Sequence, residues 1–300
     1  MFTFINHYQI LILICLMGIL TSCQSTKKLT TTSFYEYDRS LPLHVSVTPQ
    51  HTETNNHQSF DVKFQSTHHQ EVTGILSYPE AMDGPVPVII LMHGLGDRKE
   101  VDYVAGGAEL LNNAGFAVLR LDLHNHGIRQ TDKFDFSFEG ETRYRTREVI
   151  TQSVFDIRRA IDFIESQDRL DAERIGYFGI SLGGVIGTVA AGIEDRIKVP
   201  VIVLAGGNIN LMFGLSAFSG KHKNYLSVID PINFVRRISP RPLLMINADE
   251  DEVIPPITSK LMYNKARKPK KIIWYEAKHR TIPVEKAYEE GINWFLNHLK

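Results

Sequence analysis

The segment Gly179-Ile180-Ser181-Leu182-Gly183 has the residue types and spacing that could make a serine nucleophilic. An apolar run at 175–178, typical of a short buried strand, precedes it, and a helix of small residues follows at once. This arrangement is typical of a nucleophile elbow, a strained turn that exposes the serine hydroxyl above the strand ends. Glycine is needed on both sides because a side chain there would collide with the neighbouring strand or helix. The first N–H groups of the new helix remain free to face an oxyanion.

A serine hydroxyl is a poor nucleophile at neutral pH and needs a base that is itself oriented by an acid. His279 is the best placed base, because it follows a strand predicted at 272–275. The other histidines after Ser181 are less suitable: His222 lies in a segment predicted to cover the site, and His298 lies in the last predicted helix.

The acid is expected on the loop that follows another predicted strand, at 243–247. This loop reads Ala248-Asp249-Glu250-Asp251-Glu252, so four carboxylates stand together. Most of them must be solvated, because buried carboxylates side by side would repel one another. The residue pattern alone leaves open which of the four orients the base.

The elements that would position these residues alternate between strand and helix. Apolar runs predict buried strands at 86–92, 116–121, 199–204, 243–247 and 272–275, besides the strand before Ser181. Helical spacing predicts helices at 103–114, 150–164 and 284–299, besides those after Ser181 and Pro256. An alternating hairpin is predicted at 59–78. The expected fold class is α/β, a doubly wound, mostly parallel sheet with helices on both faces.

Residues 206–241 interrupt this alternation where a small lid over the site would sit. Its apolar residues fit two interpretations equally, an acyl pocket or the ordinary packing of a lid; they are Met212, Phe213, Leu215 and Phe218. The charges of Asp156, Arg158 and Arg159 on the predicted 150–164 helix are interpreted as solvated or helix-capping.

From about residue 59 onward the chain resembles the α/β-hydrolases, with the dienelactone-hydrolase and serine-esterase branches nearest. Five segments carry this resemblance: His93-Gly94-Leu95-Gly96-Asp97, Asp122-Leu123-His124-Asn125-His126-Gly127, the serine elbow, the acidic loop and His279. The family's acid usually stands as Gly-x-x-Asp before an apolar-Pro step. Alignment of Val253-Ile254-Pro255 with that step places Asp251 as the acid, and Asp249 is the alternative.

The resemblance also implies an oxyanion hole formed by the backbone N–H groups of Leu95 and Leu182, with His93 in a structural role. Two positions depart from the family pattern and affect the local loop geometry. Ala248 stands where glycine is usual, and Lys278 stands where glycine often precedes the histidine.

The resulting hypothesis is a serine hydrolase that cleaves carboxylic esters through Ser181, His279, Asp251 and an acyl-enzyme, without a cofactor. A peptidase or thioesterase with the same triad, and a non-catalytic, membrane-tethered binding protein, are the alternatives. The x-His-x-His spacing of His124 and His126 suggests a metal, but no third ligand is apparent, so no metal site is expected. The substrate is expected to be a small-molecule or lipid ester.

The N-terminus predicts export. Residues 1–22 resemble a lipoprotein-type signal peptide, because a short apolar run ends in Leu20-Thr21-Ser22-Cys23, which resembles the bacterial lipobox. Cys23 would then carry lipid and anchor the protein to a membrane of the cell envelope, and a secreted or periplasmic protein is the alternative. Residues 23–57 are predicted as a polar tether that leads into irregular or edge-strand structure, and 58–300 as the hydrolase domain.

Composition excludes several classes of protein. The formal net charge is −1, so no global field favours nucleic acid as a partner. Both cysteines, Cys15 and Cys23, lie near the N-terminus, which excludes a disulfide framework or a cysteine-ligated metal in the folded body.

Overall fold

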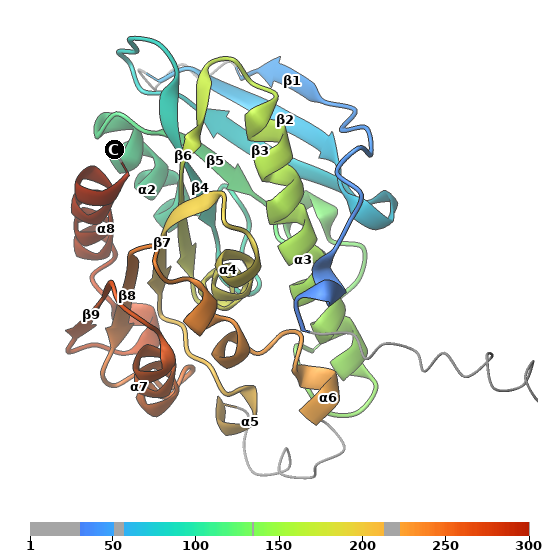
Figure 1. Ribbon diagram of the computed structural model, residues 1–300, viewed down its shortest axis with the longest axis vertical. Coiled ribbons are helices and arrows are strands. Elements are labelled where there is room, and N and C mark those ends of the chain that lie inside the picture. Colours follow the sequence, from blue (N-terminus) through green and yellow to red (C-terminus); the bar gives the residue numbers. More distant parts are fainter. Residues whose placement is uncertain (1–30, 51–56, 134, 213–222, 300) are drawn as a thin grey trace, which may run out of the picture.

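The computed structural model describes residues 31–50, 57–133, 135–212 and 223–299, and one nine-stranded sheet forms its centre (Figure 1). The strand order is β1-β2-β3-β5-β4-β6-β7-β8-β9. The pairs β1–β2, β2–β3 and β3–β5 are antiparallel. All later pairs in this order, from β5–β4 to β8–β9, are parallel. The strands are β1 (Ser46–Pro49), β2 (Ser59–Gln65), β3 (Glu71–Ser77), β4 (Val86–Met92), β5 (Ala117–Leu121), β6 (Leu170–Ile180), β7 (Ile197–Val203), β8 (Leu243–Ala248) and β9 (Lys270–Tyr275). The predicted mostly parallel α/β sheet and its hairpin are confirmed.

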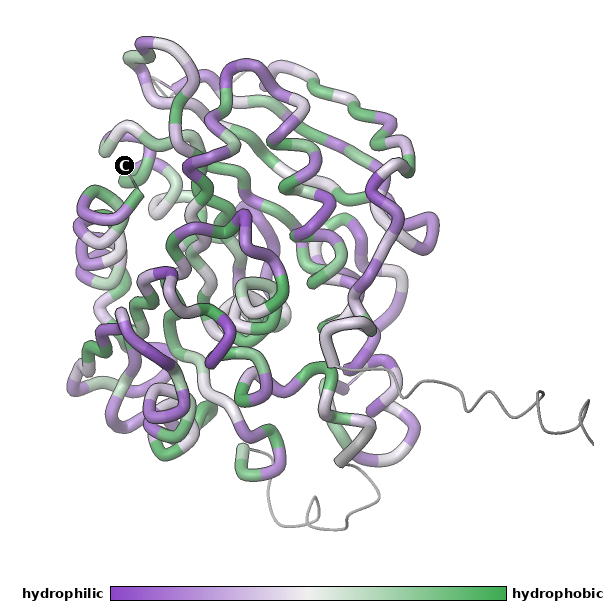
Figure 2. The backbone as a smooth tube through the Cα atoms, viewed as in Figure 1, coloured by the Kyte–Doolittle hydropathy of each residue, from purple (hydrophilic) through white to green (hydrophobic). Residues whose placement is uncertain are grey.

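Helices cover both faces of this sheet. They are α2 (Asp102–Asn113), α3 (Thr142–Glu165), α4 (Leu182–Ile193), α5 (Ile209–Met212), α6 (Lys223–Leu226), α7 (Pro256–Lys265) and α8 (Val284–His298). Strand β4 shows why both faces need a cover, since its apolar residues alternate between two clusters. Ile90 and Met92 pack with buried residues of α3 and α4, whereas Ile89 and Leu91 pack with those of α2 and α8. The central strands are accordingly apolar in Figure 2, and the outer helices carry mixed hydropathy.

Helix α3 begins at Thr142, eight residues before the predicted start at 150. Its first two turns carry Arg143, Arg145, Arg147 and Glu148, which mask the apolar period in the sequence. The prediction that the charges farther along this helix are solvated or helix-capping is wrong for Asp156 and Arg159. Asp156 and Arg159 are each 1% exposed, and Asp156 pairs with Arg129 at 2.8 Å.

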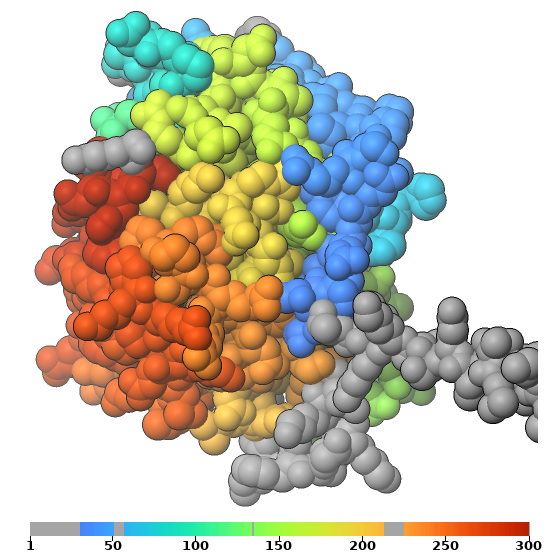
Figure 3. Space-filling view, in the orientation of Figure 1, coloured from blue at the N-terminus to red at the C-terminus, as the bar shows by residue number. Residues whose placement is uncertain are grey.

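The N-terminal segment crosses the outer side of α3 and covers Arg159. It also supplies hydrogen-bond acceptors for the buried guanidinium. The Arg159 guanidinium donates to the carbonyls of Leu41 and Pro42 at 2.7 and 3.3 Å, and pairs with Asp162 at 2.8 Å. We call residues 33–43 the N-terminal strap; Figure 3 shows it in blue along the molecular surface. Tyr35 anchors the strap, because its fully buried side chain donates to the Val228 carbonyl at 2.7 Å. The predicted tether, 23–57, therefore includes two ordered parts. They are the strap, which packs on the body, and the edge strand β1, which pairs with β2.

The segment 206–241 is described at 206–212 and 223–241, and Phe213, Leu215 and Phe218 lie outside the described residues. Its last part belongs to the core rather than to a cover, since Phe234 and Val235 are fully buried. The predicted signal peptide and Cys23 also lie outside the described residues. Within the described part of the chain, no helix is long and apolar enough to span a bilayer.

Candidate active site

Ser181 stands between the end of β6 and the start of α4 in a backbone conformation that is rare for a residue with a side chain. Its φ is +54° and its ψ is −115°, and strain of this kind costs on the order of 1–3 kcal/mol. Its N–H donates to the Val203 carbonyl at 2.9 Å, which holds the turn against β7. The two glycines are required by close backbone contacts. A Cβ at Gly183 would lie 2.7 Å from the His93 carbonyl oxygen, and one at Gly179 would overlap the Gly183 backbone.

His279 lies four positions after the end of β9 and connects Ser181 to Asp251. Its Nε2 is 3.0 Å from the Ser181 Oγ, and its Nδ1 is 2.7 Å from the Asp251 Oδ2. A carboxylate can only accept, so Nδ1 carries the proton and Nε2 is left to accept from the serine hydroxyl. The structure thus brings together the three side chains that the sequence analysis selected, in the order that general-base activation of a serine requires.

The loop after β8 holds Asp251 rigidly. The Asp251 Oδ1 accepts from the N–H groups of Val253 and Ile254 at 2.9 and 2.7 Å, and its side chain is 2% exposed. Asp249, the alternative acid, is exposed and accepts instead from the Ala277 N–H at 3.3 Å. Of these two carboxylates, Asp251 is the one that touches the imidazole.

The expected oxyanion donors flank Ser181, one at the start of α4 and the other on the turn after β4. Leu182 is the first residue of α4, so its N–H lies outside the helical hydrogen-bond ladder. Leu95 belongs to the turn after β4, where Gly96 has a φ of +80°. This turn passes close to the nucleophile, since a Cβ added at Gly94 would lie 3.5 Å from the Ser181 Cβ.

His93 is buried beneath this turn. Its Nδ1 donates to the Gly94 carbonyl at 2.7 Å, and its Nε2 accepts from the Leu123 N–H at 3.1 Å. Burial lowers the pKa of His93 to about 4, so the ring stays neutral. Its hydrogen bonds join the loops after β4 and β5, which is a structural role.

Asp122 joins the same two loops and was not singled out from the sequence as a structural residue. It is 1% exposed and accepts from the Lys99 N–H at 3.0 Å, the Lys99 Nζ at 2.6 Å and the Thr73 Oγ1 at 3.0 Å. Gly127 is required beside it, because a Cβ there would overlap the carboxylate. The position of Asp122 directly after the strand predicted at 116–121 is the sequence signal that could have identified it.

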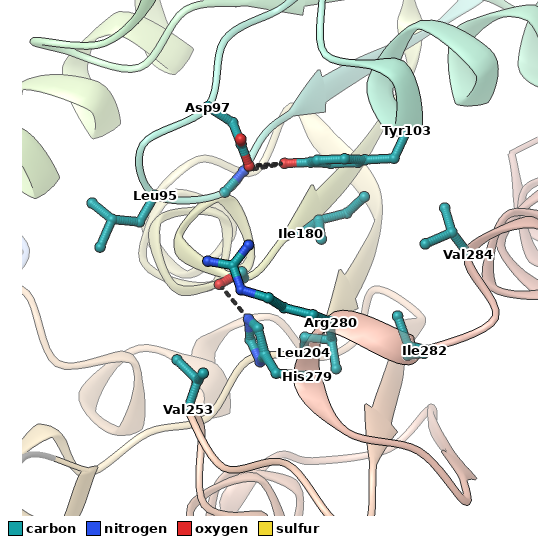
Figure 4. A pocket seen from close by; sticks show the side chains of 12 residues that line it. Leu95, Asp97, Tyr103, Ile180, Leu204, Val253, His279, Arg280, Ile282 and Val284 are labelled. Carbon is teal, nitrogen blue, oxygen red and sulfur yellow. Dashed lines mark hydrogen bonds between the residues drawn. The ribbon is translucent and has the colours of Figure 1, made fainter.

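The cavity around Ser181 has two arms, and Figure 4 shows the larger one. The larger arm, of about 240 Å³, contains polar side chains from Asp97, Tyr103 and Arg280 besides His279. The smaller arm, of about 130 Å³, is almost wholly apolar, with walls that include Phe136, Phe138, Ile150, Val185, Ile209 and Met212. Sequence reasoning proposed Met212 for such a pocket and missed the two phenylalanines, because they lie in a loop without periodic pattern.

His124 and His126 do not form part of a metal cluster among the described residues. The described ranges contain no group of three or more His, Cys, Asp or Glu side chains that could hold a metal ion. The His126 Nδ1 bonds the His124 carbonyl at 2.9 Å, and burial lowers the pKa of both imidazoles.

Comparison with other proteins finds relatives at low sequence identity, among them an acetyl esterase. The chain is 24% identical over 233 residues to the acetyl esterase Axe7A of Xylanibacter ruminicola, which covers 70% of this chain and 52% of the relative. It is 26% identical over 144 residues to YtaP of Bacillus subtilis, which covers 44% of this chain and 48% of the relative. The chain spans about half the length of these curated relatives.

Solved structures with the same fold cover most of the chain. An acetyl xylan esterase from Paenibacillus sp. R4 superposes with a TM-score of 0.72 at 22% identity, over 86% of this chain and 90% of the other. Acetyl xylan esterase 1 from Thermoanaerobacterium sp. gives 0.68 at 18%, over 86% and 89%. These likenesses establish the α/β-hydrolase fold.

A family model narrows this fold to one family. The model of the acetyl xylan esterases (AXE1) matches residues 32–204, more than half of the chain. The match extends from the N-terminal strap through β7 and includes Ser181. The chain therefore belongs to the acetyl xylan esterase (AXE1) family.

Proposed function

We propose that this protein is a serine esterase that hydrolyses esters of short-chain carboxylic acids, acetyl esters first among them. The observation that carries the proposal is the hydrogen-bonded series Asp251–His279–Ser181, with distances of 2.7 and 3.0 Å. Membership of the acetyl xylan esterase family supports the same bond type.

In the proposed reaction, the Ser181 Oγ attacks the ester carbonyl while the His279 Nε2 takes the hydroxyl proton. Asp251 holds the imidazole in the required tautomer and stabilises the imidazolium. The N–H groups of Leu95 and Leu182 bind the oxyanion, and a donor of this kind contributes about 3–4 kcal/mol of transition-state stabilisation. The C–O bond then breaks, His279 protonates the leaving alcohol, and water releases the acid from Ser181 by the same steps.

The dimensions of the smaller arm support a short acyl group. It holds about 130 Å³ between the rings of Phe136 and Phe138 and the aliphatic side chain of Val185. An acetyl methyl group can be desolvated there, whereas a long chain would need displacement of these side chains. The alcohol would then occupy the larger, more polar arm.

Two alternatives are weighed by the same geometry. A non-catalytic binding protein would be favoured if the acid pointed away from the base. Asp251 instead points toward His279, which favours the enzyme. A thioesterase or peptidase remains an alternative, since the same series of groups serves those reactions.

A panel of 4-nitrophenyl esters of increasing acyl length, with thioester and peptide substrates beside it, tests the proposal. We expect the highest kcat/KM for acetyl or propionyl esters, and a loss of at least about 10³-fold in Ser181→Ala. Unchanged turnover in Ser181→Ala at an unchanged melting temperature would refute it.

A further inference from the structure

Tyr103, on the first turn of α2, makes two hydrogen bonds beside the nucleophile that the catalytic steps above do not use. Its hydroxyl accepts from the Gly94 N–H at 2.8 Å and donates to the Asp97 Oδ2 at 2.8 Å. Figure 4 shows the Tyr103 ring and the Asp97 carboxylate directed at each other above the cavity. Both partners belong to the turn that carries Leu95, so one hydroxyl fastens the turn at its start and at its end.

The directions of these bonds follow from the groups involved. An amide N–H can only donate and a carboxylate can only accept, so the single hydroxyl proton of Tyr103 goes to Asp97. Donation to a carboxylate polarises the phenolic oxygen and strengthens its acceptance from Gly94. Burial also raises the pKa of Tyr103 well above its usual value of 10, which keeps the proton available at every working pH.

The turn has little room for a different position. The Asp97 N–H donates to the Gly94 carbonyl at 3.4 Å, and the His93 Nδ1 donates to the same oxygen at 2.7 Å. A Cβ at Gly94 would lie 3.4 Å from the Tyr103 hydroxyl and 3.5 Å from the Ser181 Cβ. Gly94 is thus held between the phenol and the nucleophile, and Leu95 follows it directly.

We propose that Tyr103 is a positioning residue that, together with Asp97, sets the place of the Leu95 N–H in the oxyanion hole. The inference rests on the proposed esterase function and adds to it a residue outside the triad and outside the oxyanion donors. Tyr103 acts on the transition state through the turn, since the oxyanion exists only after attack on the carbonyl. Its loss should therefore lower kcat with little change in KM.

The test compares Tyr103→Phe with Tyr78→Phe, a control that removes a hydroxyl from a buried tyrosine in the hairpin region. We expect kcat on 4-nitrophenyl acetate to fall about 10-fold in Tyr103→Phe, part of the 10²–10³-fold loss seen when a whole oxyanion donor is removed. KM should stay within about 2-fold, and affinity for a trifluoromethyl ketone, which mimics the oxyanion, should fall in step with kcat/KM. A wild-type kcat in Tyr103→Phe, or an equal loss in Tyr78→Phe, would overturn the inference.

Asp97 supplies a second pair of variants should Tyr103→Phe fold poorly. Asp97→Asn keeps an oxygen that can accept from Tyr103 and should retain most of the activity, whereas Asp97→Ala should lose about as much as Tyr103→Phe. Equal activity of these two variants would contradict the role of Asp97.

A measurement that does not depend on turnover distinguishes a failure of the positioning role of Tyr103 from a failure of the proposed esterase function. Hydrogen exchange of the Gly94 amide, followed by NMR, should be at least about 10-fold faster in Tyr103→Phe than in wild type or Tyr78→Phe. Unchanged exchange would overturn the inference even in an active enzyme. Faster exchange in a protein that hydrolyses none of the esters would uphold the positioning role and refute the esterase proposal.

Discussion

At the residue scale, the proposed reactivity of Ser181 depends on one carboxylate that is held in place by hydrogen bonds, and not on the acidic loop as a whole. Asp251 has both oxygens engaged, one by His279 and one by the two N–H groups of Val253 and Ile254. An imidazole held by such a carboxylate keeps one tautomer and one orientation, which the serine needs in order to lose its proton. Asp249 sits two residues away on the same loop without that contact.

A matched pair of variants tests this division of roles. Asp251→Asn should lower kcat on 4-nitrophenyl acetate by about 10⁴-fold, because an amide can hold the imidazole in the wrong tautomer. Asp249→Asn should stay within a few-fold of wild type, since its side chain bonds the Ala277 N–H and not the imidazole of His279. Steady-state kinetics decide between them, and a larger loss in Asp249→Asn would make Asp249 the acid.

The residues that we propose as catalytic could be predicted from the sequence because each follows a strand and has distinctive neighbours in the chain. Ser181, Asp251 and His279 stand at the carboxyl ends of β6, β8 and β9, and parallel strands place those ends at one edge of the sheet. Tyr103 and Asp97 were missed as a pair because their contact depends on how α2 packs against the turn after β4. Which of the four neighbouring carboxylates contacts the imidazole of His279 is likewise decided by the loop conformation, which no local sequence pattern encodes.

At the element scale, α4 can approach the sheet closely because its first two turns contain Gly183, Gly184 and Gly187. Gly187 faces the fully buried ring of Tyr177, whose hydroxyl donates to the Gly183 carbonyl at 2.6 Å. A Cβ at Gly187 would overlap that ring. The placement of the helix that follows Ser181 therefore depends on this glycine.

Two glycine substitutions test this packing. Gly187→Ala should lower the free energy of unfolding by about 1–3 kcal/mol, because the added methyl must displace Tyr177 or the helix. Gly106→Ala, in the middle of α2 with open space around its Cβ, should raise it by about 0.5–1 kcal/mol. Urea unfolding measures both, and stabilisation by Gly187→Ala would contradict the described contact.

Elements with a clear hydrophobic period were predictable, and those shaped by distant contacts were not. The strands and the hairpin follow from runs and alternation. The charged first turns of α3 hide its start, and the burial of Arg159 depends on the strap, which contributes the Leu41 and Pro42 carbonyls from about 117 positions earlier in the chain. A charged side chain that bonds distant backbone carbonyls looks the same in the sequence as a solvated one.

At the scale of the whole molecule, a network of buried charges joins α3 to the end of α4. Glu194 accepts from Arg158 at 3.0 Å and from Arg196 at 2.8 Å. Burial alone would raise the pKa of Glu194, but the hydrogen bonds and charges of Arg196 and Arg158 outweigh it and lower the pKa to about 2. Because the unfolded chain binds this proton at higher pH, the carboxylate stabilises the fold above about pH 4.5, and this contribution is lost as the pH falls toward 2.

The variant Glu194→Gln should therefore be less stable than wild type at pH 7, by an amount on the order of 3 kcal/mol. The difference should shrink as the pH is lowered from 4.5 to 2. Glu173→Gln, which removes an exposed carboxylate 3.6 Å from Lys198, serves as the control and should change stability by less than about 0.5 kcal/mol. Denaturant unfolding across this pH range measures both, and a difference for Glu194→Gln that does not depend on pH would contradict the network.

We also propose that the strap connects the body to a lipid anchor at Cys23, as the lipobox-like segment predicts. Metabolic labelling with an alkynyl fatty acid should mark the wild-type protein in the membrane fraction. Cys23→Ser should abolish both the label and the sedimentation with membranes. Unlabelled protein with the signal removed would favour the secreted or periplasmic alternative.

The central claim is that Ser181 is an activated nucleophile, and covalent labelling with a fluorophosphonate tests it most directly. We predict that the probe modifies Ser181, as mapped by mass spectrometry of the digested protein. The labelling rate should fall by at least about 10²-fold in Asp251→Asn and remain near wild type in Asp249→Asn. A folded protein that is not labelled, or that is labelled at another serine, would contradict the account.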